Sequence, residues 1–274
     1  MLLFSYHLFT GNSSRNCHLG KAVTSEENIP LMWNDMYSSL YLIKQVEGID
    51  MQKKLRAEVT EEQVLKRIGG RRNEATAEYL QEAMSLGATL VDPKGIYELF
   101  PVAQIEKDRL ILENGETFRS EHLCKLLDGA EKIIVMCCTI GPALEKKVKE
   151  LNEEGNYGEA YFLDVYGATA VGTAMSNLYK ELLEELKGYG TTVYMSPGQL
   201  DWNIRDQKVV FKLISPEAIG VTLNESNMMN PVKSTTAVFG IGDPAKVKKG
   251  NFSCASCPKR NYCTFRHEAE ALAM

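Results

Sequence analysis

The chain of 274 residues has only four histidines and two tryptophans, no long apolar run and no excess of basic residues. Three of the histidines, His7, His18 and His122, have no partner at ligand or catalytic spacing. A net charge of −5 argues against duplex nucleic acid as a partner. Nothing approaches the eighteen or more apolar residues of a membrane span, and the apolar start lacks a basic n-region and a cleavage site. We therefore expect no membrane partner, signal peptide or anchor.

Several fingerprints of enzymes and cofactor-binding proteins are also missing. There is no G-x-S-x-G, no H-E-x-x-H and no Cys–His pair in a nucleophile context, which argues against a hydrolase. No phosphate-binding glycine motif follows a strand, and helices and strands interleave without a βαβ period. This order predicts an α+β domain with a mainly antiparallel sheet.

The seven cysteines are unevenly distributed. A secreted disulfide framework would spread its cysteines along a short chain, so the pattern favours a reducing compartment and predicts a cytoplasmic protein. Cys137 and Cys138 are adjacent within the apolar run I-I-V-M-C-C-T-I, and we expect them in the core as part of a buried strand.

Local signals place the main elements. Thr60 followed by two glutamates predicts the start of a helix. Arg109–Leu112 reads as a strand that turns at Asn114-Gly115, and Ile133–Cys138 as a buried strand. Glu159–Leu186 is predicted to be one long helix whose small, apolar first half permits close packing.

Turn-forming residues cluster between Ser196 and Ser234, beginning with S-P-G-Q-L-D-W. Proline presets φ and glycine accepts a positive φ, so Pro197-Gly198 predicts a sharp turn whose bare backbone a ligand can approach. Asp201 and Trp202 then offer a carboxylate and a flat apolar face, which suit an amino group and a purine or sulfonium.

Further along this region, a helix is expected at Ile204–Leu213. Glu225 is expected on a T-L-N-E-S strand, with Asn224 and Ser226 on the opposite face by alternation. Asn230-Pro231 begins another turn. The alternative is that these are ordinary turns that join strands, because turn chemistry alone carries no function.

The order of these segments and their residues resemble those of the reactivation domain of cobalamin-dependent methionine synthase. The resemblance covers roughly Arg56 to Gly242 and is clearest in the second half. It implies a twisted antiparallel sheet flanked by helices, and a loop and strand that hold S-adenosylmethionine beside a corrinoid. The residues that it implies for cofactor binding are Asp164, Tyr194, Ser196, Pro197, Gly198, Asp201 and Glu225.

The sequence departs from the family pattern at three of the positions that this resemblance aligns. Tyr194 stands where the family has an arginine, Gln199 where it has a tyrosine, and Gly172 where it commonly has a glutamate. Losing the arginine removes a bidentate, charge-assisted contact to a carboxylate. Asp164 is retained, although its side chain could equally cap or pair locally.

The C-terminal segment N-F-S-C-A-S-C-P-K-R-N-Y-C-T-F-R-H places Cys254, Cys257, Cys263 and His267 in a C-x2-C-x5-C-x3-H array. Four such ligands match a closed tetrahedral zinc site. Three cysteines with an exchangeable fourth ligand suit an iron–sulfur cluster instead. We expect a metal or a cluster here and leave its identity open. The alternative is that the three cysteines are unrelated reduced thiols.

The resemblance implies a stand-alone reactivation module, since such relatives often end in a cysteine cluster. The module presents the methyl group of S-adenosylmethionine to cobalt on a separate corrinoid protein or cobalamin-dependent methyltransferase, with an electron donor as a further partner. If active it belongs to the methyltransferase class. The alternative is a metal- or Fe–S-binding interaction protein that has lost S-adenosylmethionine binding. The expected organisation is an N-terminal extension (1–50), an α+β domain (51–245) and a cysteine-rich tail (246–274).

Overall fold

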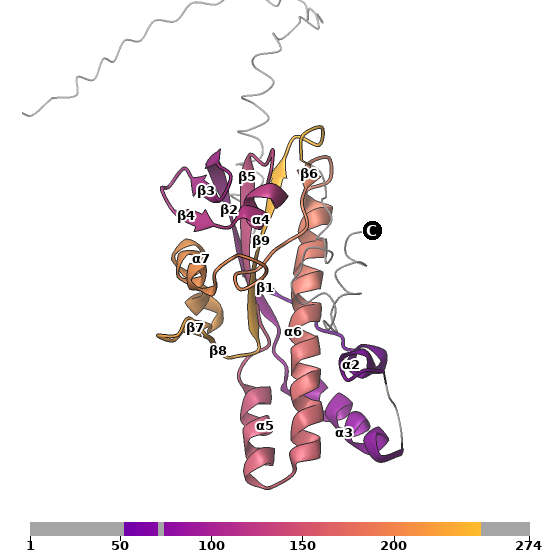
Figure 1. Ribbon diagram of the computed structural model, residues 1–274. Helices are drawn as coiled ribbons and strands as arrows, with labels where there is room; N and C mark the ends of the chain where they lie inside the picture. Colours follow the sequence, from indigo (N-terminus) through magenta and orange to yellow (C-terminus); the bar gives the residue numbers. More distant parts are fainter. Residues whose placement is uncertain (1–51, 71–73, 248–274) are drawn as a thin grey trace, which may run out of the picture. The chain divides into compact units, whose positions relative to one another are not determined.

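An antiparallel sheet organises the residues that this computed structural model describes, 52–70 and 74–247 (Figure 1). The strand order is β4-β3-β2-β5-β9-β6, and β1 pairs with β2 beside this path. Every pairing of neighbouring strands is antiparallel, which confirms the predicted α+β fold class. The strands are β1 (Gln52–Lys54), β2 (Lys94–Ile105), β3 (Arg109–Leu112), β4 (Thr117–Arg119), β5 (Lys132–Thr139), β6 (Gly190–Thr191) and β9 (Ser234–Gly242).

The central strand β5 is buried on both faces. Side chains alternate along a strand, so Ile133, Val135 and Cys137 enter one layer of the core while Ile134, Met136 and Cys138 enter the other. A strand covered on both sides reads as a continuous apolar run, as I-I-V-M-C-C does. The prediction that both cysteines lie in the core is confirmed, and burial raises the pKa of each thiol above its ordinary range.

One face of the sheet is covered by α6 (Tyr157–Glu185), which confirms the single long helix predicted there. Its second half packs Leu178, Tyr179 and Leu182 onto β2, β5 and β9. Its first half extends past the sheet, where α5 (Ala143–Glu153) and α3 (Glu74–Leu90) lie against it (Figure 1). Although α6 has 29 residues, no helix in the described ranges is long and apolar enough to cross a membrane.

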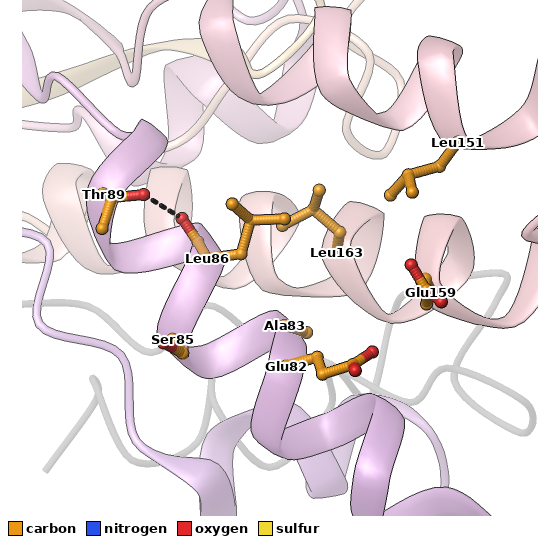
Figure 2. A pocket seen from close by; sticks show the side chains of 8 residues that line it. All are labelled: Glu82, Ala83, Ser85, Leu86, Thr89, Leu151, Glu159 and Leu163. Atoms are coloured by element: carbon orange, nitrogen blue, oxygen red, sulfur yellow. Dashed lines mark hydrogen bonds between the residues drawn. The ribbon is translucent and has the colours of Figure 1, made fainter.

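Small residues allow these helices to approach closely. A Cβ atom at Gly87 of α3 would lie 2.4 Å from the ring of Tyr166, and one at Gly167 would lie 2.6 Å from Leu144. Between α3, α5 and α6 remains a pocket of about 370 Å³ (Figure 2). The helix predicted to start at Thr60 is α2 (Glu61–Arg67), and a capping box between Thr60 and Gln63 confirms its start.

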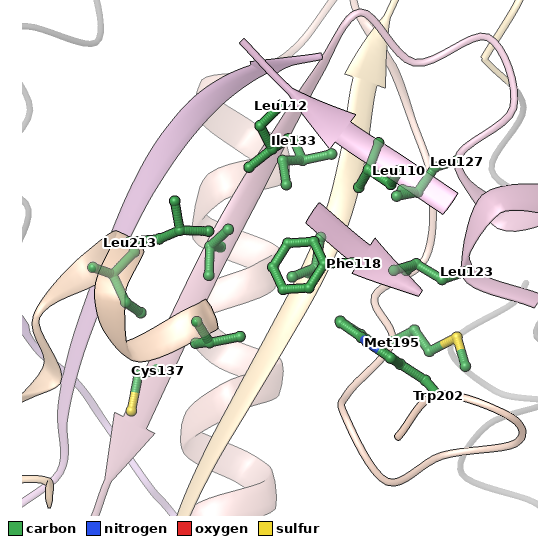
Figure 3. Close-up of a cluster of buried hydrophobic side chains, with 14 of the residues drawn as sticks. Leu110, Leu112, Phe118, Leu123, Leu127, Ile133, Cys137, Met195, Trp202 and Leu213 are labelled. Carbon is green, nitrogen blue, oxygen red and sulfur yellow. The ribbon is translucent and has the colours of Figure 1, made fainter. Parts of the chain in front are cut away.

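The second face of the sheet is covered by the β3–β4 hairpin and by α4 (Glu121–Leu126) and α7 (Gln207–Ile214) (Figures 1 and 3). Phe118 of β4 and Trp202 meet edge to face at the centre of this layer, with ring centroids 5.4 Å apart. The predicted turn after Arg109–Leu112 is confirmed, with Gly115 at φ +85° between β3 and β4. The helix expected at Ile204–Leu213 begins as a 3-10 turn, η1 (Ile204–Asp206), and a second 3-10 turn, η2 (Pro216–Ile219), follows α7.

The prediction of a strand that contains Glu225 is wrong. Strand β7 ends at Leu223, and its partner β8 begins at Met229, so Glu225 lies in the connecting turn (β7, Thr222–Leu223; β8, Met229–Asn230). The Asn224 side chain closes this turn by accepting hydrogen bonds from the backbone N–H groups of Ser226 and Met228. Asparagine satisfies a turn in this way, which competes with strand pairing.

Two glycines in helices allow a matched test of this packing. Gly87→Ala should lower the free energy of unfolding by about 1–3 kcal/mol, because the new methyl group meets the ring of Tyr166. Gly172→Ala should be neutral or raise it by up to about 1 kcal/mol through helix propensity, since its Cβ would meet only the flexible end of Arg67 at 3.3 Å. Urea unfolding of both variants measures the difference, and equal effects would contradict the close α3–α6 packing.

Candidate functional site

Four of the predicted cofactor-binding residues lie in one loop between β6 and η1, here called the 196–203 loop. It begins after Met195, whose backbone exchanges two hydrogen bonds of 2.8 and 2.9 Å with Val238 of β9. Within the loop, the N–H of Gly198 donates to the carbonyl of Trp202, and the Gln199 side chain accepts from the N–H of Ser196. The loop is therefore fixed to the edge of the sheet at its start and braced internally.

The tip of the loop is bare backbone. Pro197 is buried and Gly198 and Gln199 are exposed. Gly198 has φ +94°, which a residue with a Cβ adopts only with strain, so the predicted proline-glycine turn is present. A Cβ at Gly198 would lie 3.3 Å from the side chain of Ile204, and Arg205 follows it as an exposed residue.

Asp201 fastens the loop to the start of α4. Its carboxylate accepts hydrogen bonds from the Ser120 hydroxyl at 2.7 Å and from the N–H of Glu121 at 2.6 Å, and its Oδ1 lies 2.9 Å from Nδ1 of His122. Burial alone would raise the pKa of Asp201, but these hydrogen bonds outweigh it and the pKa lies below the ordinary value. Ser120 itself caps α4 by accepting from the N–H of Leu123.

A second carboxylate holds the end of the loop. Asp206 accepts from the indole N–H of Trp202 at 2.9 Å and from the N–H of Arg119 at 3.1 Å. The indole is therefore buried with its one donor satisfied, which is what a fully enclosed tryptophan requires. Trp202, predicted as a flat face for a ligand, is a core residue whose ring packs edge to face against Phe118.

Tyr194 points away from the loop. Its ring packs edge to face on Tyr179 of α6, with centroids 5.1 Å apart, whereas the next residue, Met195, enters the opposite layer of the core. The Tyr179 hydroxyl donates to the carbonyl of Thr192 at 2.7 Å, and burial raises the pKa of Tyr179. Tyr194 thus secures the strand that precedes the loop against α6.

Asp164 lies on a different part of the fold. It pairs with Lys233 at 2.7 Å, and the backbone N–H of Lys233 donates to the carboxylate of Glu145. Both acids and Lys233 line a groove of about 470 Å³ between α5, α6 and the start of β9. Lys233 marks the groove, and Val238 marks the loop because it pairs with Met195. These two residues are five positions apart, which corresponds to about 16 Å along an extended strand.

The predicted site is therefore divided. The structure brings Ser196, Pro197, Gly198 and Asp201 together, and the described contacts of Asp164 and of the Glu225 turn involve neither that loop nor each other. The predicted metal ligands Cys254, Cys257, Cys263 and His267 lie outside the described residues. Within residues 52–70 and 74–247, no group of three His, Cys, Asp or Glu side chains is placed to hold a metal ion.

Sequence reasoning missed the residues that hold the loop. The serine and glutamate at the start of α4 are a recognisable N-cap signal, so the capping role of Ser120 could be predicted from the sequence. The contact of Asp206 with Arg119 carries no such signal, because the two residues are 87 positions apart; the same holds for the pair of Lys233 and Asp164 in the groove, 69 positions apart. His122 is the one histidine that the described part places beside a carboxylate.

Comparison with known proteins yields a solved structure with a similar fold. The crystal structure of the MetH reactivation domain bound to AdoHcy superposes with a TM-score of 0.44 and 14% sequence identity. The match covers 61% of this chain and 63% of that one, so the aligned part spans less than two thirds of the solved domain. No family model and no curated protein matches the chain.

Asp201 makes the attachment of the loop dependent on pH. Because its folded pKa is below that of the unfolded chain, the ionised carboxylate stabilises the fold above about pH 4, and this contribution is lost as the pH falls through the folded pKa. Asp201→Asn should lower the urea midpoint at pH 7, and the difference from wild type should shrink below about pH 4.

The matched control is Asp128→Asn, an exposed aspartate with no hydrogen bond or ion pair recorded in the described part of the chain. It should leave the midpoint unchanged at both pH values. A gap between wild type and Asp201→Asn that stays constant from pH 7 to pH 3 would show that the carboxylate charge does not hold the loop.

Proposed function

We propose that this protein binds S-adenosylmethionine at the tip of the 196–203 loop and serves as a stand-alone reactivation module for a corrinoid protein. The observation that carries the proposal is the loop itself, which bears the S-P-G turn of the resemblance and is held rigid at the edge of an antiparallel sheet. A preorganised loop loses little conformational freedom when a ligand binds.

The residues fit this ligand in part. The exposed backbone at Gly198 and Gln199 can approach an adenosyl or amino group closely. Arg205 is exposed and follows Ile204, whose side chain faces Gly198, and we assign it as the anchor for the ligand carboxylate in place of the missing family arginine. Asp201 and Trp202 act through the loop and position its backbone.

When bound, S-adenosylmethionine supplies a methyl group on a sulfonium. In the proposed role, a separate corrinoid protein or cobalamin-dependent methyltransferase provides the acceptor, and an electron donor provides the reducing equivalent. The contribution of this chain is to hold the ligand and to dock, so that proximity and orientation set the rate. If the methyl transfer depends on this chain, the protein belongs to the methyltransferase class.

A second candidate, a metal-bearing interaction protein that no longer binds S-adenosylmethionine, is favoured by one specific observation. Asp164 is neutralised by Lys233, and Glu225 lies in a separate turn, so two of the implied carboxylates do not reach the loop. Titration with the ligand separates the two candidates.

Calorimetric titration of S-adenosylmethionine should detect binding to the wild-type chain. Gly198→Ala should weaken it, because a Cβ fills the approach to the backbone and strains φ +94°. Gly115→Ala is the control, since Gly115 has a similar φ of +85° with nothing within 4 Å and lies in a different turn. Arg205→Ala should weaken binding about ten- to hundred-fold, the contribution of a charged hydrogen bond.

Arg205→Ala is a cleaner test than restoring the family arginine at Tyr194, because Tyr194→Arg would also remove the ring contact with Tyr179. Absence of binding to the wild-type chain, with the fold intact, would favour the interaction protein.

The C-terminal cysteines give a second test. Protein purified anaerobically should contain a bound metal, and the triple substitution Cys254→Ser, Cys257→Ser and Cys263→Ser should lose it, whereas Cys17→Ser should retain it. Visible absorption that bleaches on reduction indicates an iron–sulfur cluster and a colourless zinc-loaded protein indicates a structural site. Full metal content in the triple variant would contradict both forms of the site.

A further inference from the structure

Exposed aromatic rings gather where α3 crosses the first turns of α6, away from the 196–203 loop. Tyr157, Tyr161 and Tyr79 are 69%, 54% and 38% exposed. Tyr79 stacks on the buried Phe162 with centroids 5.9 Å apart, and Tyr161 meets the Phe162 ring edge to face at 5.6 Å. We call Tyr79, Tyr157, Tyr161 and Phe162 the aromatic patch.

The patch is built into the helix packing. A Cβ at Gly158 would lie 2.7 Å from the ring of Tyr79, so glycine at this position lets the tyrosine lie across the α6 backbone. Tyr157 and Tyr161 are one helical turn apart and therefore share a face of α6. Large aromatic side chains held in place but left exposed are typical of protein-binding surfaces rather than of solvated helix faces.

Acidic side chains surround this patch. Helix α3 contains Glu74, Glu78 and Glu82 and no lysine or arginine, and the first basic residue of α6 is Lys180. On α5, Lys147 and Lys149 pair with glutamates of their own helix, and Lys146 is a third, exposed lysine. The two arginines that precede α3 in the sequence lie outside the described residues.

The pocket between α3, α5 and α6 shares two of its helices with the patch, with Glu82 one turn after Tyr79 on α3 and Glu159 within the first turn of α6. Leu86, Leu151 and Leu163 form its apolar wall. Figure 2 shows the carboxylates of Glu82 and Glu159 together at one end, and neither makes a recorded ion pair or hydrogen bond with a described residue. An apolar wall that ends in two carboxylates matches an arginine or lysine side chain, whose aliphatic stem is buried while its charge stays at the mouth.

We propose that the aromatic patch and this pocket form a docking surface for an arginine-rich segment of a partner protein. Guanidinium groups stack on exposed tyrosine rings and pair with carboxylates, so both kinds of side chain on this surface select the same partner chemistry. A second copy of this chain fits poorly, because a two-fold contact would bring the same acidic surface of both copies together. This proposal does not depend on S-adenosylmethionine binding.

The basic C-terminal tail of the same molecule is also a poor occupant. The described chain ends at Val247, which packs on Gly190 just beyond the C-terminal end of α6, whereas the patch lies at its N-terminal end. A helix of 29 residues is about 43 Å long. A tail attached at Val247 would have to run the length of α6 to reach the patch, and truncation behind Val247 tests whether it does.

The test uses the full-length chain and fluorescein-labelled octa-arginine in a polarisation titration. The wild type should bind it, and Tyr157→Ser combined with Tyr161→Ser should weaken binding about fivefold or more, the loss expected for exposed cation–π contacts. Tyr189→Ser, at a 36% exposed tyrosine beyond the far end of α6, is the control and should have no effect. Both substituted tyrosines are largely solvated, so the fold should be retained, and circular dichroism verifies it.

A second pair of variants distinguishes binding at this surface from general attraction between octa-arginine and an acidic protein. Glu78→Gln with Glu82→Gln should weaken octa-arginine binding more than Asp128→Asn with Glu217→Gln, two exposed acids elsewhere whose removal changes the net charge equally. Equal losses in the two pairs, or unchanged binding in the tyrosine variant, would overturn the proposal.

Two further outcomes identify other occupants, and each would overturn the partner proposal. A dimer in sedimentation that the tyrosine variant dissociates would identify a second copy of the chain. Tighter octa-arginine binding after truncation behind Val247 would identify the C-terminal tail.

Discussion

The burial of β5 and β9 on both faces is the constraint on which the remaining structure depends. Two adjacent antiparallel strands with apolar side chains in both directions need a layer of packing on each side. Helix α6 provides one layer, and the β3–β4 hairpin with α4, α7 and Trp202 provides the other. The free edge of β9 must also be covered, because unpaired strand edges invite pairing with other chains. The segment from Thr192 to Met195 covers it, with a hydrogen bond to Gly240 and two to Val238. The 196–203 loop begins where that covering segment ends.

Features that depend on local chemistry were predictable from the sequence, and features that depend on distant partners were not. The I-I-V-M-C-C run indicated a buried strand, and the Thr60 cap and the long small-residue helix were found as expected. Glu225 was misplaced because β7 has only two residues, too few for alternation to show, and because Asn224 prefers to close a turn. The pairing of Asp164 with Lys233 joins α6 to the residue before β9, and no spacing in the sequence reveals such a contact.

The carboxylates near the loop illustrate how residue type misleads about role. Asp201 resembles a ligand-binding acid in the sequence, yet all of its recorded contacts go to Ser120, Glu121 and His122 at the start of α4. Asp206 satisfies the buried indole of Trp202 in the same way. The contacts of both acids are with protein donors, so in this structure they stabilise the loop. What such a loop can offer a ligand is its exposed backbone at Gly198 and Gln199, together with the neighbouring Arg205.

Helix α6 connects the two proposed surfaces. Tyr179 contacts Tyr194 next to the loop, whereas Tyr157 lies in the aromatic patch, and 22 residues of continuous helix separate them, or about 33 Å. A short peptide that fills the pocket beside Glu82 therefore cannot reach the loop. A folded protein of about 150 residues has dimensions of this order and can contact both surfaces at once. Because α6 is one uninterrupted helix packed against the sheet, a partner held at the patch would approach the loop in a fixed orientation. In the proposed role, this arrangement would fix the position of a docked partner relative to a ligand at the loop.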